Sequence, residues 1–191
     1  MARVHLVEKE SAPPEVASIY QKIEANGARI LNLYKVVANN PRVMLNIIRL
    51  GNSIIGQMAL PPRLRELVIL RVAKLTGSEY EWAQHAPLAL EVGLTKEQVD
   101  TISDWQNSPE FNEEERTILQ FTNEVTQNVK VTDQTFNELK KFFNDQLIVE
   151  LTLTAGYYAM LARVLVALQV EIEEVSAGSA RDLIGRPTTP E

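Results

Sequence analysis

The sequence predicts an all-α protein of about eight helices. Apolar residues recur three and four positions apart along most of the chain, and no segment shows the sustained alternation of apolar and polar residues that marks a half-buried strand. Of the 191 residues, 45% are hydrophobic and 23% are charged, which are ordinary values for a globular protein. The length suits one domain with its own core, so we expect a single domain over residues 1–191, with a lead-in over 1–14 and a loosely attached tail over about 176–191.

Each expected helix is bounded by residues that start or end helices. Pro41 and Pro62 lie at first turns, where a missing N–H costs nothing, and Gly93 lies where a C-terminal cap is preferred. In chain order, the expected helices cover residues 15–27, 41 to about 55, 63–75, 79–92, 95–105, 113–128, 132 to about 144, and 145–173.

Three of these helices begin at a polar residue of the kind that caps a helix. Thr95, Asn112 and Thr132 are the expected N-caps. Gln98 lies three residues after Thr95, in the capping-box position. These residues would satisfy free N–H groups at the helix starts.

Two of the helices carry more apolar surface than one small chain is expected to cover. Residues 63–75 and 147–170 are rich in leucine, valine and isoleucine. Burial of this surface between subunits is the natural solution, so we expect a homo-oligomer.

Composition argues against several classes of protein. The net charge is −6 with a pI of about 5.1, and without a basic cluster such a chain is a poor nucleic-acid binder. No run reaches 18 uninterrupted apolar residues and the first sixteen lack the apolar run of a signal peptide, so we expect a cytoplasmic protein that does not bind membranes. With no cysteine and two histidines, His5 and His85, we expect no metal site and no cofactor.

The stretch TGSEYEWAQHAP, residues 76–87, has a structural and a functional interpretation. Ser78 and Glu81 form a capping-box pattern, which would make both residues part of an ordinary helix start. In a helix, however, Ser78, Glu81 and His85 share one face, and Glu81 is placed to orient the imidazole. A lone histidine at such a border is more often structural, so both interpretations stay open.

Glu66 lies on an otherwise apolar helix face. A carboxylate there must be paired or it tends to take a proton. Arg63, three residues earlier, is its expected partner in a purely structural role. In the functional interpretation, Glu66 is a general acid or base.

These residues lie in a stretch that resembles a known family. RELVILRVAKLTGSEYEWAQHAPLALEVGLT, preceded by LNLYKVVANNP, is similar to the carboxymuconolactone decarboxylase family, which includes the alkylhydroperoxidase D-like (AhpD-like) proteins. The resemblance covers about residues 30–170, the expected core, and is densest over Leu60 to Leu94. It implies an AhpD-like helical bundle that assembles as a dimer, trimer or hexamer.

The peroxidase branch of that family uses a glutamate, a Cys-x-x-Cys pair and a histidine. These positions fall on Glu66, Ser78, Glu81 and His85, so the spacing is kept while both thiols are absent. A serine hydroxyl cannot replace a peroxidatic cysteine, and a glutamate cannot resolve a disulfide. We therefore expect no peroxiredoxin activity by the cysteine route, even though the resembled family includes peroxidases.

The decarboxylase branch works without the cysteine pair and acts on a small lactone carboxylic acid. Its chemistry resembles proton transfer, which needs two groups with separated pKa values. An arginine would hold the substrate carboxylate, and nothing in the sequence chooses among Arg63, Arg71 and Arg163.

We therefore expect a cofactor-free acid–base enzyme, of a lyase-like rather than a thiol-peroxidase type, that acts on a small lactone, organic acid or related carbonyl compound. Glu66 would transfer the proton, His85 would be its partner, Glu81 would orient His85, and Ser78 would donate a hydrogen bond to the substrate. The alternative is a non-catalytic small-molecule-binding or assembly protein of the same fold, which would be favoured if Glu66 and His85 were sealed in the core and satisfied each other.

Three further possibilities stay open at this stage. Trp82 lines a pocket or simply packs, and one of Tyr157 and Tyr158 reaches the polar cluster or lies in an interface. A metal site formed by Glu66, Glu81 and His85 is a weaker alternative.

Overall fold

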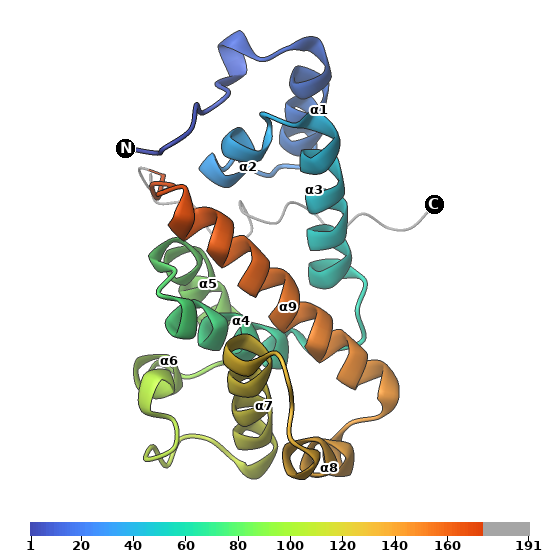
Figure 1. Ribbon diagram of the computed structural model, residues 1–191, viewed down its shortest axis with the longest axis vertical. Coiled ribbons are helices and arrows are strands. Elements are labelled where there is room, and N and C mark those ends of the chain that lie inside the picture. The colour runs from blue at the N-terminus through green and yellow to red at the C-terminus, as the bar shows by residue number, and fades with distance from the viewer. Residues whose placement is uncertain (174–191) are drawn as a thin grey trace. The chain divides into compact units, whose positions relative to one another are not determined.

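A computed structural model describes residues 1–173, and in that part of the chain all regular structure is helical (Figure 1). The predicted all-α fold is confirmed. The α-helices are α1 (Pro14–Ala25), α2 (Asn32–Val37), α3 (Pro41–Gly56), α4 (Pro62–Thr76), α5 (Glu79–Glu91), α6 (Lys96–Thr101), α7 (Glu113–Asn123), α8 (Asp133–Phe142) and α9 (Asp145–Ala167). The predicted loose tail, residues 176–191, lies outside the described residues.

The predicted helix boundaries differ from the observed ones in several places. The helix expected over 95–105 is α6 as far as Thr101 and a 3-10 turn over Ile102–Asp104. Residues 28–39 contain the short helix α2, which sequence analysis left unassigned. The expected helix over 113–128 changes after Asn123 into a π-helical turn, Glu124–Asn128. The final helix stops at Ala167 rather than at residue 173, and Gln169 beyond it has a positive φ of 52°.

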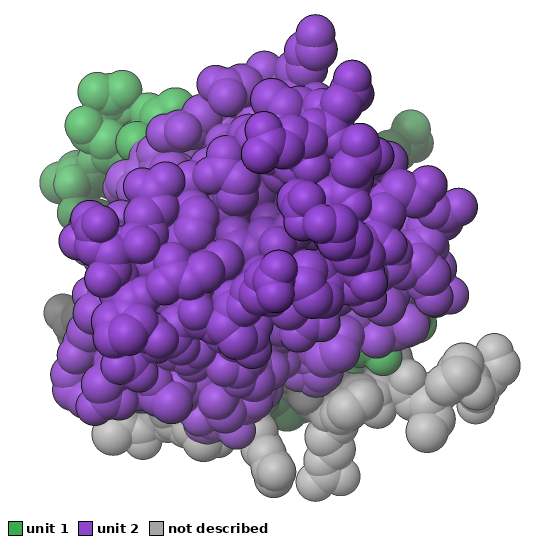
Figure 2. Space-filling view, turned by 90° about the horizontal axis from the view of Figure 1, so that it is seen from below, with its two compact units in different colours: residues 1–57, 165–191 green, residues 58–164 purple. Residues whose placement is uncertain are grey.

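The chain divides into two compact units, coloured separately in Figure 2. One comprises residues 1–57 with the segment from Leu165 onward, and the other comprises residues 58–164. The expectation of a single domain stays a prediction.

The first unit has its own small core around the buried face of α1. Residues of α1 and α3 pack there with Val7 of the lead-in, and the Tyr20 hydroxyl donates a hydrogen bond of 2.8 Å to the Val7 carbonyl. The Val7 backbone N–H donates a hydrogen bond to the backbone carbonyl of Lys35 in α2. The lead-in is therefore part of this core.

The second unit is built around α4, which is buried on almost its whole circumference and packs mainly against α5 and α7. Helix α4 ends at Gly77, whose φ of +66° is a left-handed conformation that glycine adopts without strain. The turn to α5 is therefore very short and consists of Gly77 and Ser78. Two consecutive helices joined so tightly bring facing side chains together.

Helix α9 is the one described helix that is long and apolar enough to cross a membrane by length and composition. In its most apolar 18-residue window, 56% is buried inside the protein. The core helix of a globular protein passes the same test, so this feature is weak evidence for a membrane span.

Candidate functional site

Glu66 of α4 and His85 of α5 meet inside the second unit. The distance from Glu66 Oε2 to His85 Nδ1 is 2.8 Å, and the Glu66 side chain is 1% exposed while that of His85 is 12% exposed. An ionised carboxylate only accepts hydrogen bonds, so Nδ1 carries the proton. In the neutral imidazole Nε2 then keeps its lone pair, as a general base requires.

The cation beside Glu66 is Arg65 rather than Arg63, so the predicted structural partner is wrong. Arg65 Nε lies 3.3 Å from Glu66 Oε1, and the Arg65 side chain is 6% exposed. A buried pair of this kind stays ionised only when both charges are compensated. Glu66 thus has a partner on each carboxyl oxygen, Arg65 on Oε1 and His85 on Oε2.

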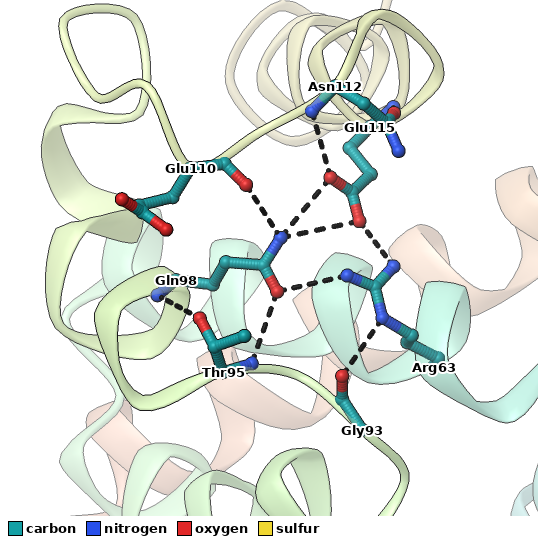
Figure 3. Close-up of polar contacts among 7 residues, drawn as sticks. All are labelled: Arg63, Gly93, Thr95, Gln98, Glu110, Asn112 and Glu115. Atoms are coloured by element: carbon teal, nitrogen blue, oxygen red, sulfur yellow. Dashed lines mark hydrogen bonds and ion pairs between the residues drawn. The ribbon is translucent and has the colours of Figure 1, made fainter.

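Arg63 turns to a different group of residues, shown in Figure 3. It pairs with Glu115, and its Nη2 donates to Gln98 Oε1 at 2.9 Å and its Nε to the Gly93 carbonyl at 3.1 Å. Gln98 and Glu115 are the third helical residues of α6 and α7, where each completes a capping box with Thr95 or Asn112. Arg63 thus joins the starts of two helices, which is a structural role.

The other arginines considered for a substrate carboxylate also have protein contacts. Arg71 Nε donates to Asn123 Oδ1 at 2.7 Å and its Nη1 donates to the carbonyls of Ile102 and Ser103. Burial lowers the pKa of Arg71 from its usual value. Arg163 donates to the carbonyl of Ala159 in its own helix. The structure gives each of these arginines a structural contact.

Glu81 occupies an unusual environment. It is 3% exposed, and neither of its carboxyl oxygens has a hydrogen-bond partner among the residues that the structure describes. Burial raises the pKa of Glu81 to about 8, and the nearby Ser78 hydroxyl offsets only part of that rise. Glu81 is therefore mainly a neutral carboxylic acid at pH 7, and the partner that orients His85 is Glu66 instead.

Ser78 is the N-cap of α5. Its hydroxyl accepts the Glu81 backbone N–H at 3.5 Å, and the residue is 1% exposed. The hydroxyl of the nearby Thr76 donates to the carbonyl of Val72 within α4. The observed contact of Ser78 is thus that of a helix cap, as the structural interpretation of residues 76–87 expects.

Tyrosines from α9 complete the cluster. The Tyr158 ring meets the His85 ring edge-on, with centroids 4.9 Å apart, and Tyr157 packs against Tyr158 in the same manner at 5.3 Å. Burial, followed by the negative charge of Glu66, raises the pKa of Tyr158 well above its usual value. Tyr158 is thus the member of the pair that reaches the cluster and stays protonated there.

The structure also bears on Trp82 and on the possible metal site. Lys74 Nζ lies 3.5 Å from the centroid of the Trp82 ring, a cation–π contact that gives one face of Trp82 a packing role. Among residues 1–173, no group of three or more histidine, cysteine, aspartate or glutamate side chains is arranged to hold a metal ion.

Arg65 is the site residue whose role sequence reasoning missed, whereas Tyr158 is one of the two tyrosines that the sequence put forward for the polar cluster. A charged residue directly before Glu66, in a helix that is otherwise apolar, was an available signal for Arg65. The position of Tyr158 depends on how α9 packs, which no local pattern reveals.

Comparison with known proteins agrees with this architecture. Residues 41–124 match the carboxymuconolactone decarboxylase family. An uncharacterised protein of Bacillus subtilis (strain 168), YdfG, is 18% identical over 140 residues, which cover 72% of this chain and 92% of YdfG.

Solved structures share the fold at low sequence identity. A peroxidase-related protein from Ralstonia eutropha JMP134, described as an alkylhydroperoxidase AhpD core, superposes with a TM-score of 0.77 at 13% identity, covering 91% of this chain and 93% of the other. The debrominase Bmp8, solved as a cysteine-to-alanine variant in complex with 2,3,4-tribromopyrrole, gives a TM-score of 0.74 at 20% identity and covers 91% and 95%. Residues 41–124 thus match the carboxymuconolactone decarboxylase family, and the described part of the chain has the helical fold of AhpD-like proteins, although its sequence contains no cysteine.

Proposed function

We propose that this protein is a cofactor-free acid–base enzyme that acts on a small lactone, organic acid or related carbonyl compound. The observation that carries the proposal is the contact of 2.8 Å between Glu66 and His85 beside Glu81, a buried acid with no partner among the described side chains. Proton transfer needs one group that accepts a proton and another that donates one at the same pH. His85 and Glu81 supply this pair.

The roles differ from those expected from the sequence. His85 Nε2 takes the proton from the substrate, and Glu66 holds the imidazole through Nδ1 and stabilises the imidazolium that forms. Glu81 donates the proton at the developing oxyanion, because its raised pKa keeps it protonated near neutral pH. Glu66, which is paired on both oxygens, is a positioning residue.

Lyase-like chemistry is favoured over thiol chemistry, because Ser78 and Glu81 occupy the positions of the Cys-x-x-Cys pair used by the peroxidase branch. The neighbour of the same fold solved with 2,3,4-tribromopyrrole shows that this architecture can receive a small ring compound in another protein. That observation supports a small-molecule substrate here as well.

Exchange of substrate carbon-bound hydrogen with deuterated solvent tests the proposal. A panel of lactones and keto acids is incubated with the protein, and exchange, decarboxylation or double-bond migration is followed by proton NMR. We expect at least one compound to react above the buffer rate, and His85→Gln and Glu81→Gln each to lower that rate by about 100-fold or more. Glu79→Gln, an exposed change two residues from Glu81, is the matched control and leaves the rate unchanged. Exchange that is equal in wild type and His85→Gln contradicts the proposal.

One observation favours the alternative of a non-catalytic small-molecule-binding or assembly protein. Glu66 is sealed at 1% exposure and satisfied by Arg65 and His85, as in a structural ion cluster. In that case the whole panel gives no reaction, while His85→Gln lowers the free energy of unfolding because it leaves Glu66 short of a donor.

We also propose self-association in a cytoplasmic setting. Val149, Leu153 and Met160 of α9 are 55%, 47% and 41% exposed, and their spacing of four and seven residues aligns them on one face. Such a face is typical of a subunit contact. Sedimentation at micromolar concentration should show an oligomer, and Leu153→Glu should shift it toward monomer, whereas a wild-type monomer contradicts the proposal.

A further inference from the structure

The charges around Glu81 are balanced without a ligand. Arg65 and Glu66, from α4, pair with each other, and His85 lies against Glu66. The groups that α9 contributes, Tyr157 and Tyr158, are phenols, and the pKa of Tyr158 is raised well above its usual value. This cluster therefore contains no uncompensated cation.

The other arginines on α4 have protein contacts too. Arg63 is held by Glu115, Gln98 and Gly93 (Figure 3), and Arg71 by Asn123 and two carbonyls. A ligand carboxylate beside Glu81 would add a negative charge next to Glu66. It would gain no guanidinium from these residues in exchange.

The buried polar atoms of the site that have no partner among the described residues are the two carboxyl oxygens of Glu81. A protonated carboxyl group offers one O–H donor and one carbonyl acceptor side by side. Both oxygens are buried and without a partner among residues 1–173, and leaving them so costs free energy. The complementary ligand group is an acceptor next to a donor, as in a primary amide, a lactam or the enol of a carbonyl compound.

We infer that the site selects an uncharged carbonyl compound with a hydrogen-bond donor beside its acceptor, and rejects the organic anion of the same shape. This inference rests on the proposed function and narrows its substrate class. Glu81 is then the group that recognises the ligand as well as the group that transfers the proton.

Benzamide and benzoate provide a matched pair of probes, because they share one shape and differ in charge. Binding is measured at pH 7.5 by the chemical-shift changes of the His85 ring in the full-length protein. We expect benzamide to bind at least about tenfold more tightly than benzoate, a difference of roughly 1.4 kcal/mol. Equal binding, tighter benzoate binding, or no binding of either probe overturns the inference.

The pH dependence of benzamide binding identifies the group responsible. In wild type, affinity should fall between pH 7.5 and 9 as Glu81 loses its proton and its donor. In Glu81→Gln, which keeps a donor and an acceptor without titrating, affinity should be flat over the same range. In Glu81→Leu, benzamide binding should be lost, while Glu79→Gln should behave as wild type. A pH profile of Glu81→Gln that matches wild type overturns the inference.

The two proposals fail separately. Benzamide preference without any exchange activity on the substrate panel contradicts catalysis alone. Exchange that is confined to anionic substrates contradicts the preference for uncharged ligands alone.

Discussion

Glu81→Gln should make the protein more stable at neutral and mildly alkaline pH. The substitution keeps the size and shape of the side chain and removes its ability to ionise. In wild type, burial raises the pKa of Glu81 from 4.5 to about 8, and Ser78 offsets only part of that rise. A buried carboxyl with a raised pKa stabilises the folded state only while it is protonated.

The sign and the magnitude follow from the two pKa values. The contribution is fully present below pH 4.5, the ordinary value, and is lost as the pH rises through about 8. The span between those values corresponds to roughly 5 kcal/mol, as an upper value, at about 1.4 kcal/mol per pH unit. Water that enters around the ionised group reduces this amount, so we expect Glu81→Gln to gain about 2 to 5 kcal/mol over wild type between pH 4.5 and pH 8.5.

Urea unfolding measured at half-unit steps from pH 4.5 to 9 provides the test. Other groups that titrate in this window are common to both proteins, so the difference between the two curves isolates Glu81. Glu79→Gln, which is exposed, should run parallel to wild type. If the curves of Glu81→Gln and wild type also stay parallel, Glu81 is ionised and solvated at pH 7, and the proton-donor role fails with it.

Four further outcomes are expected. Val129 has a φ of +63° and is 85% exposed, so Val129→Asn should raise the free energy of unfolding by about 1 kcal/mol in urea unfolding, and a loss of stability would contradict the strain. Ser78→Ala should lower it by about 1 kcal/mol, since Ser78 caps α5, and an unchanged midpoint would show that the 3.5 Å contact contributes nothing. Burial would raise the pKa of Glu124, but hydrogen bonds from Thr135, Thr132 and Gln120 outweigh burial and lower it. Glu124→Gln should therefore lower the free energy of unfolding above about pH 4.5. The unfolding free energies of Glu124→Gln and wild type should converge as the pH falls through the lowered pKa. Purified protein should reduce no alkyl hydroperoxide in a thiol-coupled assay, and turnover that survives removal of contaminating peroxidases would refute the role assigned to the cysteine-less positions.

The sequence was informative where local chemistry decides the structure. Asn112, Thr95 and Thr132 were predicted as N-caps, and each accepts the backbone N–H three residues later. The convergence of Glu66 and His85 was also predictable, because a glycine-ended turn joins two consecutive helices. In these cases the interacting residues are close in sequence or connected by a short turn, so spacing alone constrains the geometry.

Sequence spacing predicted the wrong partner where a residue far away in the sequence formed the contact instead. Arg63 lies one helical turn before Glu66, yet it binds Glu115, which is 52 residues away and already held in a capping box. That carboxylate is preorganised, so less side-chain freedom is lost in pairing with it. Tyr158 likewise reaches His85 from α9, and its position follows from packing that the pattern of one helix cannot encode.

The comparison of Glu66 with Glu81 explains why the site can do chemistry at all. Both carboxyl groups are almost fully buried, at 1% and 3% exposure, and lie on consecutive helices. Glu66 has Arg65 and His85 as partners, whereas Glu81 has no hydrogen-bond partner among the described residues, and burial raises its pKa to about 8. A buried acid left unpaired weakens the fold, and a simple apolar residue at position 81 would remove that cost. Residues that break a local rule without a visible structural gain are concentrated at functional sites. The polar atoms of Glu81 are therefore better explained by a ligand that approaches them than by the stability of α5.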